Sequence, residues 1–145
     1  MKLKSFEEFL AKNIVRKQTP NRHRALSLLN EAEEKNKFLE ISLRNIPSEQ
    51  MSPNFIVEHC YDVIIELVRA KMFLDGFNSG NSHEAEVSYM EKLEFPKSEV
   101  VFMDELRYYR NGIKYYGKIL DKEYADKVLT FMKKTFPKLV SLIAK

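Results

Sequence analysis

Hydrophobic and polar residues follow helical periodicity along almost the whole chain. Apolar residues recur at steps of three, four and seven, and prolines or clusters of Asn, Ser and Gly separate the periodic segments. This pattern predicts about six helices. They cover approximately residues 4–17, 21–45, 52–77, 83–93 and 98–116, with a last helix that begins after Asp121 and is kinked at Pro137.

The segment 52–77 has the broadest apolar arc and is expected at the centre of the fold. Its main stripe consists of Ile56, Cys60, Val63, Leu67, Ala70 and Leu74. Short connections join the helices from Ser52 onward, which favours antiparallel neighbours. The sequence therefore predicts an all-α protein. Residues 51–145 should form an antiparallel up-and-down helical bundle, and residues 1–50 an additional helical extension packed on or beside it.

Composition narrows the class of protein. With 145 residues and 44% hydrophobic content, the chain can bury one core. A formal charge of +3 is too small to indicate a nucleic-acid partner by itself. A single cysteine, Cys60, allows no intramolecular disulfide and fits a reducing compartment. The sequence shows neither a signal-peptide pattern nor an apolar run of about 18 residues, so we expect a cytoplasmic protein without a membrane segment.

The helix over residues 98–116 should have two different faces. Its expected core face, within about 80° of arc on a helical wheel, consists of Phe102, Leu106, Tyr109, Ile113 and Tyr116. The opposite face carries Asp104, Tyr108, Asn111 and Tyr115, with Arg107 and Lys114 beside them and Arg110 on the other flank. A polar helix face that is exposed to solvent would explain most of this pattern. Exposed aromatic rings beside cations are, however, typical of a surface that binds a partner.

The run Leu106-Arg-Tyr-Tyr-Arg110-Asn111-Gly-Ile-Lys-Tyr115-Tyr116-Gly117 resembles the signature helix of the HEPN family. In that helix an Arg followed by a polar residue precedes a His by about five positions. The run from Tyr61 to Phe77, followed by Ser82-His83, is similar to the family's central helix and the turn after it. The resemblance covers residues 55–143 and leaves the N-terminal third unexplained.

The resemblance implies a helical bundle that dimerises through its signature helices. HEPN proteins include metal-independent ribonucleases, toxins and partners of small nucleotidyltransferases. By this match Arg110 would hold a phosphate, Asn111 would support it, and Tyr115 stands where the His is expected. A phenol, with a reference pKa near 10, is a poor general base at neutral pH. The resemblance thus predicts association with RNA or a nucleotide more strongly than ribonuclease activity.

Further binding residues follow from the same match. Residues expected to contact RNA or a nucleotide are Arg107, Lys114, Tyr108, Tyr116 and His83. Arg110 and Tyr115 lie about 140° apart on a continuous helix. They can act together if Gly112 breaks the helix or if a two-fold homodimer brings Arg110 of one chain near Tyr115 of the other, and we expect the homodimer. The alternative hypothesis is a non-catalytic helical module in which the same side chains form a dimer or partner interface.

Other polar groups have simpler interpretations. Glu58, Asp62 and Glu66 follow one helical edge, which is expected to be solvated or to pair with Arg110 or Arg107. The basic segment 16–24 could hold phosphate or an acidic partner, although an exposed basic turn is the simpler interpretation. Cys60 should be an inert core residue. The sequence predicts neither a metal site nor a cofactor.

Overall fold

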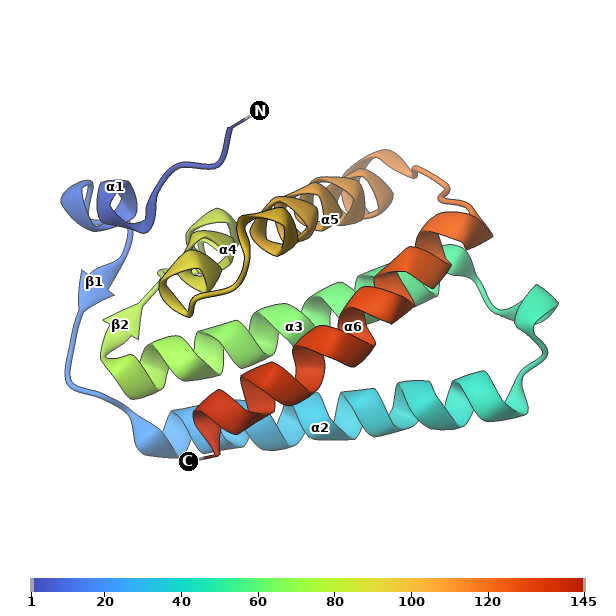
Figure 1. Ribbon diagram of the computed structural model, residues 1–145, viewed down its shortest axis with the longest axis horizontal. Coiled ribbons are helices and arrows are strands. Elements are labelled where there is room, and N and C mark those ends of the chain that lie inside the picture. The colour runs from blue at the N-terminus through green and yellow to red at the C-terminus, as the bar shows by residue number, and fades with distance from the viewer. Residues whose placement is uncertain (1, 145) are drawn as a thin grey trace.

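The structure, a computed structural model, describes residues 2–144. Its elements in chain order are α1 (Phe6–Ala11), β1 (Arg16–Lys17), α2 (Arg22–Asn45), the short 3-10 helix η1 (Ser48–Gln50), α3 (Pro53–Asp75), β2 (Phe77–Asn78), α4 (His83–Lys92), α5 (Lys97–Tyr116) and α6 (Lys122–Ile143). The predicted all-α helical bundle is confirmed, and within the described residues the only sheet is the two-residue ladder of β1 and β2 (Figure 1).

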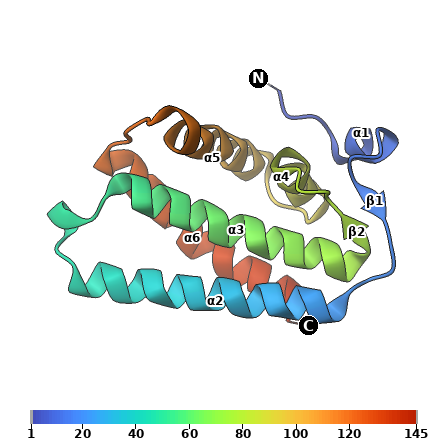
Figure 2. The same cartoon turned by 180° about the vertical axis from the view of Figure 1, so that it is seen from behind.

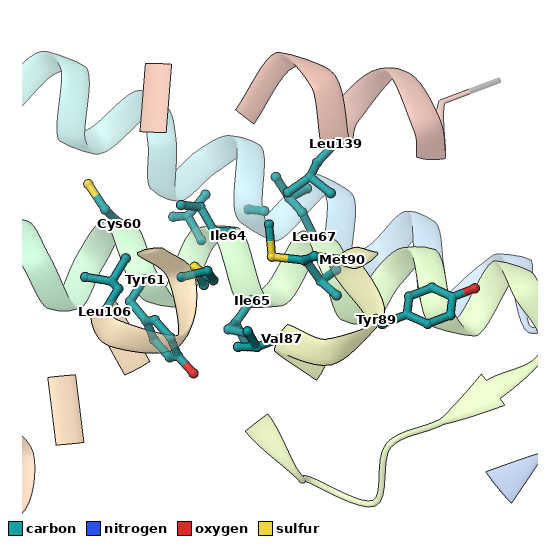
Figure 3. Packing of buried hydrophobic residues seen from close by; sticks show 14 of the residues in the cluster. Cys60, Tyr61, Ile64, Ile65, Leu67, Val87, Tyr89, Met90, Leu106 and Leu139 are labelled. Carbon is teal, nitrogen blue, oxygen red and sulfur yellow. The ribbon is translucent and has the colours of Figure 1, made fainter. Parts of the chain in front are cut away.

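Helix α3 is the centre of the bundle. Thirteen of its 23 residues are buried, and α2, α4, α5 and α6 all pack against it. Figures 1 and 2 show α2 along one side of α3, α4 and α5 along another, and α6 crossing α2 and α3 on one face. Leu67 of α3, Met90 of α4 and Leu139 of α6 come close together (Figure 3). One continuous core therefore joins helices that are far apart in sequence.

Local capping explains where most helices begin and end. Side-chain oxygens of Ser52 and Asp121 accept hydrogen bonds from the backbone N–H groups of Phe55 and Tyr124, as predicted. Gly117, in the left-handed conformation (φ 64°), follows the last residue of α5. At α4 the cap is Ser82, whose Oγ accepts a hydrogen bond from the backbone N–H of Ala85. Helix α6 continues through Pro137.

The basic segment after α1 departs from the predicted helix over residues 4–17. Helix α1 ends at Ala11, and Arg16 and Lys17 pair antiparallel with Asn78 and Phe77. The ladder continues because Gln18 N–H donates to Gly76 O at 2.9 Å. A Cβ on Gly76, whose φ is 84°, would lie 2.7 Å from that Gln18 carbonyl oxygen. Only glycine allows this close approach, which fixes the basic turn to the end of α3.

The core face predicted for α5 is confirmed in part, because Leu106 is buried and Phe102 and Ile113 are partly buried against the core. The buried residues of the helix are Val100, Met103 and Leu106, so its core face is rotated relative to the predicted one. Arg110 follows Leu106 by four residues and Met103 by seven, so it lies on the buried face instead of a flank. Tyr116, predicted to be a core residue, is 86% exposed.

A buried ion pair joins α3 to α4. Glu86 is 0% exposed and accepts hydrogen bonds from Arg69 Nε at 2.6 Å and Nη2 at 3.0 Å. Ser79 Oγ also donates to Glu86, at 2.7 Å. Such a two-pronged pair fixes the relative position of its two helices. Removing one partner would leave the other charge uncompensated.

We expect Glu86→Gln to destabilise the protein by about 3 kcal/mol, the lower end of the range for a broken buried pair, because Arg69 keeps some contact with solvent. Urea denaturation measures this loss. Glu31→Gln, which removes an exposed carboxylate 3.4 Å from Lys35, is the matched control and should cost less than about 1 kcal/mol. Equal losses in the two variants would contradict a structural role for the Glu86 pair.

Candidate functional site

Four side chains from three helices meet beside the core and form what we call the Arg110 cluster: Tyr61, Asp62, His83 and Arg110. A hydrogen bond of 3.1 Å joins Tyr61 Oη and His83 Nδ1, and the two rings stack with centroids 5.8 Å apart. The Arg110 guanidinium carbon lies 5.5 Å from the centroid of the Tyr61 ring. Arg110 Nη2 donates to Asp62 Oδ1 at 3.3 Å.

Each member of the cluster owes its position to a local feature of the chain. Tyr61 and Asp62 are consecutive in α3, so one side chain enters the core while the other remains at its edge. His83 is the first residue of α4, directly after the Ser82 cap. Arg110 extends the buried face of α5. The structure therefore brings together two residues selected from the sequence, Arg110 and His83, through a tyrosine between them.

Arg110 carries a charge that is only partly compensated. Its side chain is 12% exposed, and its one ion-pair partner within residues 2–144 is Asp62, whose side chain is 43% exposed. The Nε–H group is buried without a hydrogen-bond partner in this part of the chain. Leaving such a donor unsatisfied costs about 1–3 kcal/mol. An oxyanion that replaced Asp62 could accept hydrogen bonds from the guanidinium with better geometry.

Burial determines the protonation of the two rings. It lowers the pKa of His83 below its ordinary value; the nearby Arg69 and Arg110 lower it further, whereas Glu86 and Asp62 oppose the shift. Burial also raises the pKa of Tyr61. At pH 7 the cluster therefore contains a neutral imidazole and a protonated phenol. A neutral imidazole can accept a proton, which is a requirement for a general base.

The other residues predicted for the site lie outside this cluster. Tyr115 is 65% exposed and Tyr116 86% exposed, whereas the contacts of the Arg110 side chain are with Tyr61 and Asp62. Asn111 is half-buried. Arg107 Nε donates to Asp104 Oδ1 at 2.9 Å within the same helix.

The exposed residues gather at the C-terminal end of α5 and in the loop after it, in a surface that we call the tyrosine–lysine tip. It consists of Tyr108, Lys114, Tyr115, Tyr116, Lys118 and Ile119. Lys114 Nζ lies 5.8 Å from the Tyr115 ring centroid, and Lys118 Nζ lies 5.4 Å from that of Tyr109. The loop is held in place because Asn54 donates to Lys118 O at 2.9 Å and accepts from Leu120 N–H at 2.8 Å.

Sequence reasoning missed Tyr61 and Glu86 as polar members of the interior. Tyr61 is 0% exposed, although Asp62 follows it directly and His59 lies two positions before it. A usable signal was present at Glu86 and Arg69, since each is a charge flanked by small or apolar residues: Ala85 and Val87 around Glu86, and Val68 and Ala70 around Arg69. Such charges are almost never buried without a partner, so each of them indicates that an oppositely charged partner lies nearby in the fold.

Comparisons with protein-family models, with curated proteins and with solved structures gave no match for this chain. Within residues 2–144, no three His, Cys, Asp or Glu side chains are grouped so that they could hold a metal ion. In the same residues, every helix is too short or too polar to cross a membrane. The site is therefore interpreted from its own geometry.

The protonation of His83 can be measured. We expect its ring protons to titrate by NMR with a midpoint below about 6.5, the ordinary value for histidine. Because the unfolded chain then binds protons more readily than the folded one, stability should fall as the pH decreases below about 6.5. His83→Gln should weaken this pH dependence, as measured by urea denaturation between pH 7 and 5. A midpoint at or above about 6.5 would contradict the effect of burial.

Proposed function

We propose that this protein is a HEPN-type protein that binds RNA or a nucleotide at the tyrosine–lysine tip, with Arg110 available to the phosphate. The observation that carries the proposal is the exposure of Tyr108, Tyr115 and Tyr116 (64%, 65% and 86%) beside lysines. Aromatic side chains are costly to leave in water and offer flat surfaces on which unpaired bases stack. Lysines beside them attract the phosphate backbone.

The Arg110 cluster would supply the phosphate contact of the proposed site. Arg110 holds Asp62 through a single hydrogen bond of 3.3 Å, and Asp62 is itself partly solvated, so an incoming phosphate could replace it. Asn111, next in the chain, is half-buried and could orient the same phosphate. Tyr115 would contribute a stacking ring, because a phenol is a poor base at neutral pH. The proposed activity is binding, and no cleavage step is assigned.

The stacking role can be tested with two double variants. We expect Tyr115→Leu/Tyr116→Leu to raise the Kd for a short single-stranded RNA at least about tenfold, because one lost stacking contact is worth about 1–3 kcal/mol. Tyr115→Phe/Tyr116→Phe keeps both rings and should bind within about twofold of the wild type, since only the hydroxyl groups are lost. Fluorescence anisotropy at fixed salt measures both affinities.

The same titrations decide against the proposal if the wild type shows no saturable binding, or if the Leu variant binds as tightly as the Phe variant. Electrophoresis of the RNA after incubation shows whether it stays intact. Arg110→Ala, compared with the wild type, tests the phosphate contact separately from stacking. Its folding is checked by the urea midpoint.

A second candidate function is homodimerisation, or docking of a protein partner such as a nucleotidyltransferase, through the same surface. The observation that favours it is Ile119, an apolar side chain that is 85% exposed next to Tyr116. Exposed apolar and aromatic groups that lie together are typical of interface cores. A two-fold arrangement of α5 would also place Arg110 of one chain near Tyr115 of its partner.

Ile119 separates the two candidates, because it has no ring for a base. If the tip is a dimer interface, the wild type should show about twice the 17.1 kDa chain mass in analytical ultracentrifugation. Ile119→Gln should then raise the dimer dissociation constant at least about tenfold, since each dimer buries two such side chains. RNA affinity should be unchanged in this variant. A monomeric wild type at micromolar concentration would exclude the dimer.

A further inference from the structure

A second polar site lies at the other end of α3, beyond the proposed RNA-binding surface. The tyrosine–lysine tip is held to Asn54 near the start of α3, whereas this cleft is lined by Arg69 and Phe73 near its end. At 1.5 Å per residue, Asn54 and Phe73 are about 28 Å apart along the helix. In Figure 1 the end of α5 and the β1–β2 ladder accordingly lie at opposite ends of α3.

The cleft has a volume of about 380 Å³ and is formed by three separate segments: the basic turn before α2, the last turns of α3, and the turn between β2 and α4. Its polar lining includes the guanidinium groups of Arg24 and Arg69 and the amides of Gln18, Asn21, Asn78 and Asn81. Neither Asp nor Glu is among its lining residues. The volume falls within the range of small-molecule sites, about 300–1,000 Å³.

The two arginines retain donors for a ligand. Arg24 is placed over the ring of Phe73, 5.0 Å from its centroid, and its guanidinium makes neither an ion pair nor a hydrogen bond within residues 2–144. Arg69 uses two of its five N–H donors on Glu86. Glu86 neutralises one of the two charges, so the cleft keeps a net positive charge of about one.

Three of the lining amides, those of Gln18, Asn21 and Asn78, add further donors, because internal hydrogen bonds already use their oxygens. Asn21 Oδ1 accepts from Arg24 N–H at 3.0 Å, and Gln18 Oε1 accepts from Asn78 Nδ2 at 3.4 Å. Asn78 Oδ1 accepts from Gly80 N–H at 2.8 Å. The NH₂ groups of Asn21 and Gln18 donate to no other group in the described residues. The lining therefore offers mainly donors, which an anion requires.

Backbone hydrogen bonds fix the chain segments that carry these side chains. Asn21 N–H donates to Phe73 O at 2.9 Å, and the β1–β2 ladder fixes the residues on either side of the cleft. The close approach at Gly76 fixes Gln18 in the same way. A site that is already ordered loses little conformational entropy on binding.

We propose that this cleft binds a phosphate monoester, with Arg24 and Arg69 as its charged contacts. Phosphate accepts paired hydrogen bonds from the planar forks of arginine side chains. The cleft is larger than a phosphate group requires, which leaves room for a small organic substituent on the ester.

The test uses the full chain and two probes, inorganic phosphate and adenosine 5′-monophosphate, in isothermal titrations at constant ionic strength. Arg24→Met keeps an unbranched apolar stem over Phe73 and removes the guanidinium. Arg22→Met removes the same charge from the same turn; Arg22 is exposed like Arg24, but it does not line the cleft. We expect saturable binding by the wild type, a Kd at least about tenfold higher in Arg24→Met, and a change within about twofold in Arg22→Met.

Absence of saturable binding by either probe would overturn the proposal, and so would an equal loss in Arg22→Met and Arg24→Met, which would indicate unspecific attraction to the basic turn. Tighter binding of adenosine 5′-monophosphate than of inorganic phosphate supports a monoester site, whereas equal or weaker binding of the monoester would overturn it in favour of free phosphate. The Tyr115→Leu/Tyr116→Leu variant should bind inorganic phosphate, which has no base to stack, as the wild type does. The Arg24-dependent part of the binding should therefore persist in this variant even if the RNA-binding proposal fails.

Discussion

The bundle depends on the compensation of polar groups that α3 carries into its interior. Arg69 lies on a helix that is otherwise packed on nearly all sides, and it is accommodated because Glu86 of α4 receives two hydrogen bonds from it. Glu66 is 7% exposed and pairs with Lys35 of α2 through one hydrogen bond of 3.1 Å to its Oε2 atom, while its Oε1 atom has no partner in the described residues. A buried charge without such a partner would cost several kcal/mol. The registers of α2 and α4 against α3 are therefore determined by charge pairing as well as by apolar packing.

The same principle explains why the Arg110 cluster differs from the other pairs. Glu86 is fully buried and bonds Arg69 at 2.6 Å, whereas Asp62 is partly solvated and bonds Arg110 at 3.3 Å. Arg110 also keeps a buried N–H group without a partner in the described chain. Native proteins leave few such groups, and those that remain often belong to functional sites. Arg69 is accordingly anchored by a buried carboxylate and keeps its remaining donors at the cleft, whereas the Arg110 guanidinium has only a partly solvated carboxylate as its ion-pair partner in the described chain.

Local features of the sequence determined most of what could be predicted. Apolar periodicity located the long helices, and Ser52, Asp121 and Gly117 act as caps because capping involves only residues a few positions apart. The β1–β2 ladder could not be predicted in this way, since it pairs Arg16 with Asn78 across 62 positions. The rotation of α5, which exposes Tyr116 and buries Arg110, depends on which neighbours α5 meets. The site was found in part: Arg110 and His83 were selected, but Tyr61 between them is apparent only once α3 and α4 are packed.

The cleft with Arg24 and Arg69 and the Arg110 cluster also differ in the group that an anion would have to displace on binding. At the cleft, Arg24 has no carboxylate partner in the described chain, and the Arg69 donors that Glu86 leaves unused are already oriented by that pair. At the Arg110 cluster, a phosphate would have to exchange with Asp62, and the affinity gained is the difference between the two partners. Weak competition of this kind favours a large ligand that also makes contacts elsewhere, such as bases stacked on Tyr115 and Tyr116. A small phosphate ester, which lacks such contacts, is better matched to the preformed cleft. The Arg110 cluster, where Asp62 competes with the ligand, is thus suited to a large ligand. The cleft, where no carboxylate competes for Arg24 in the described chain, is suited to a small one.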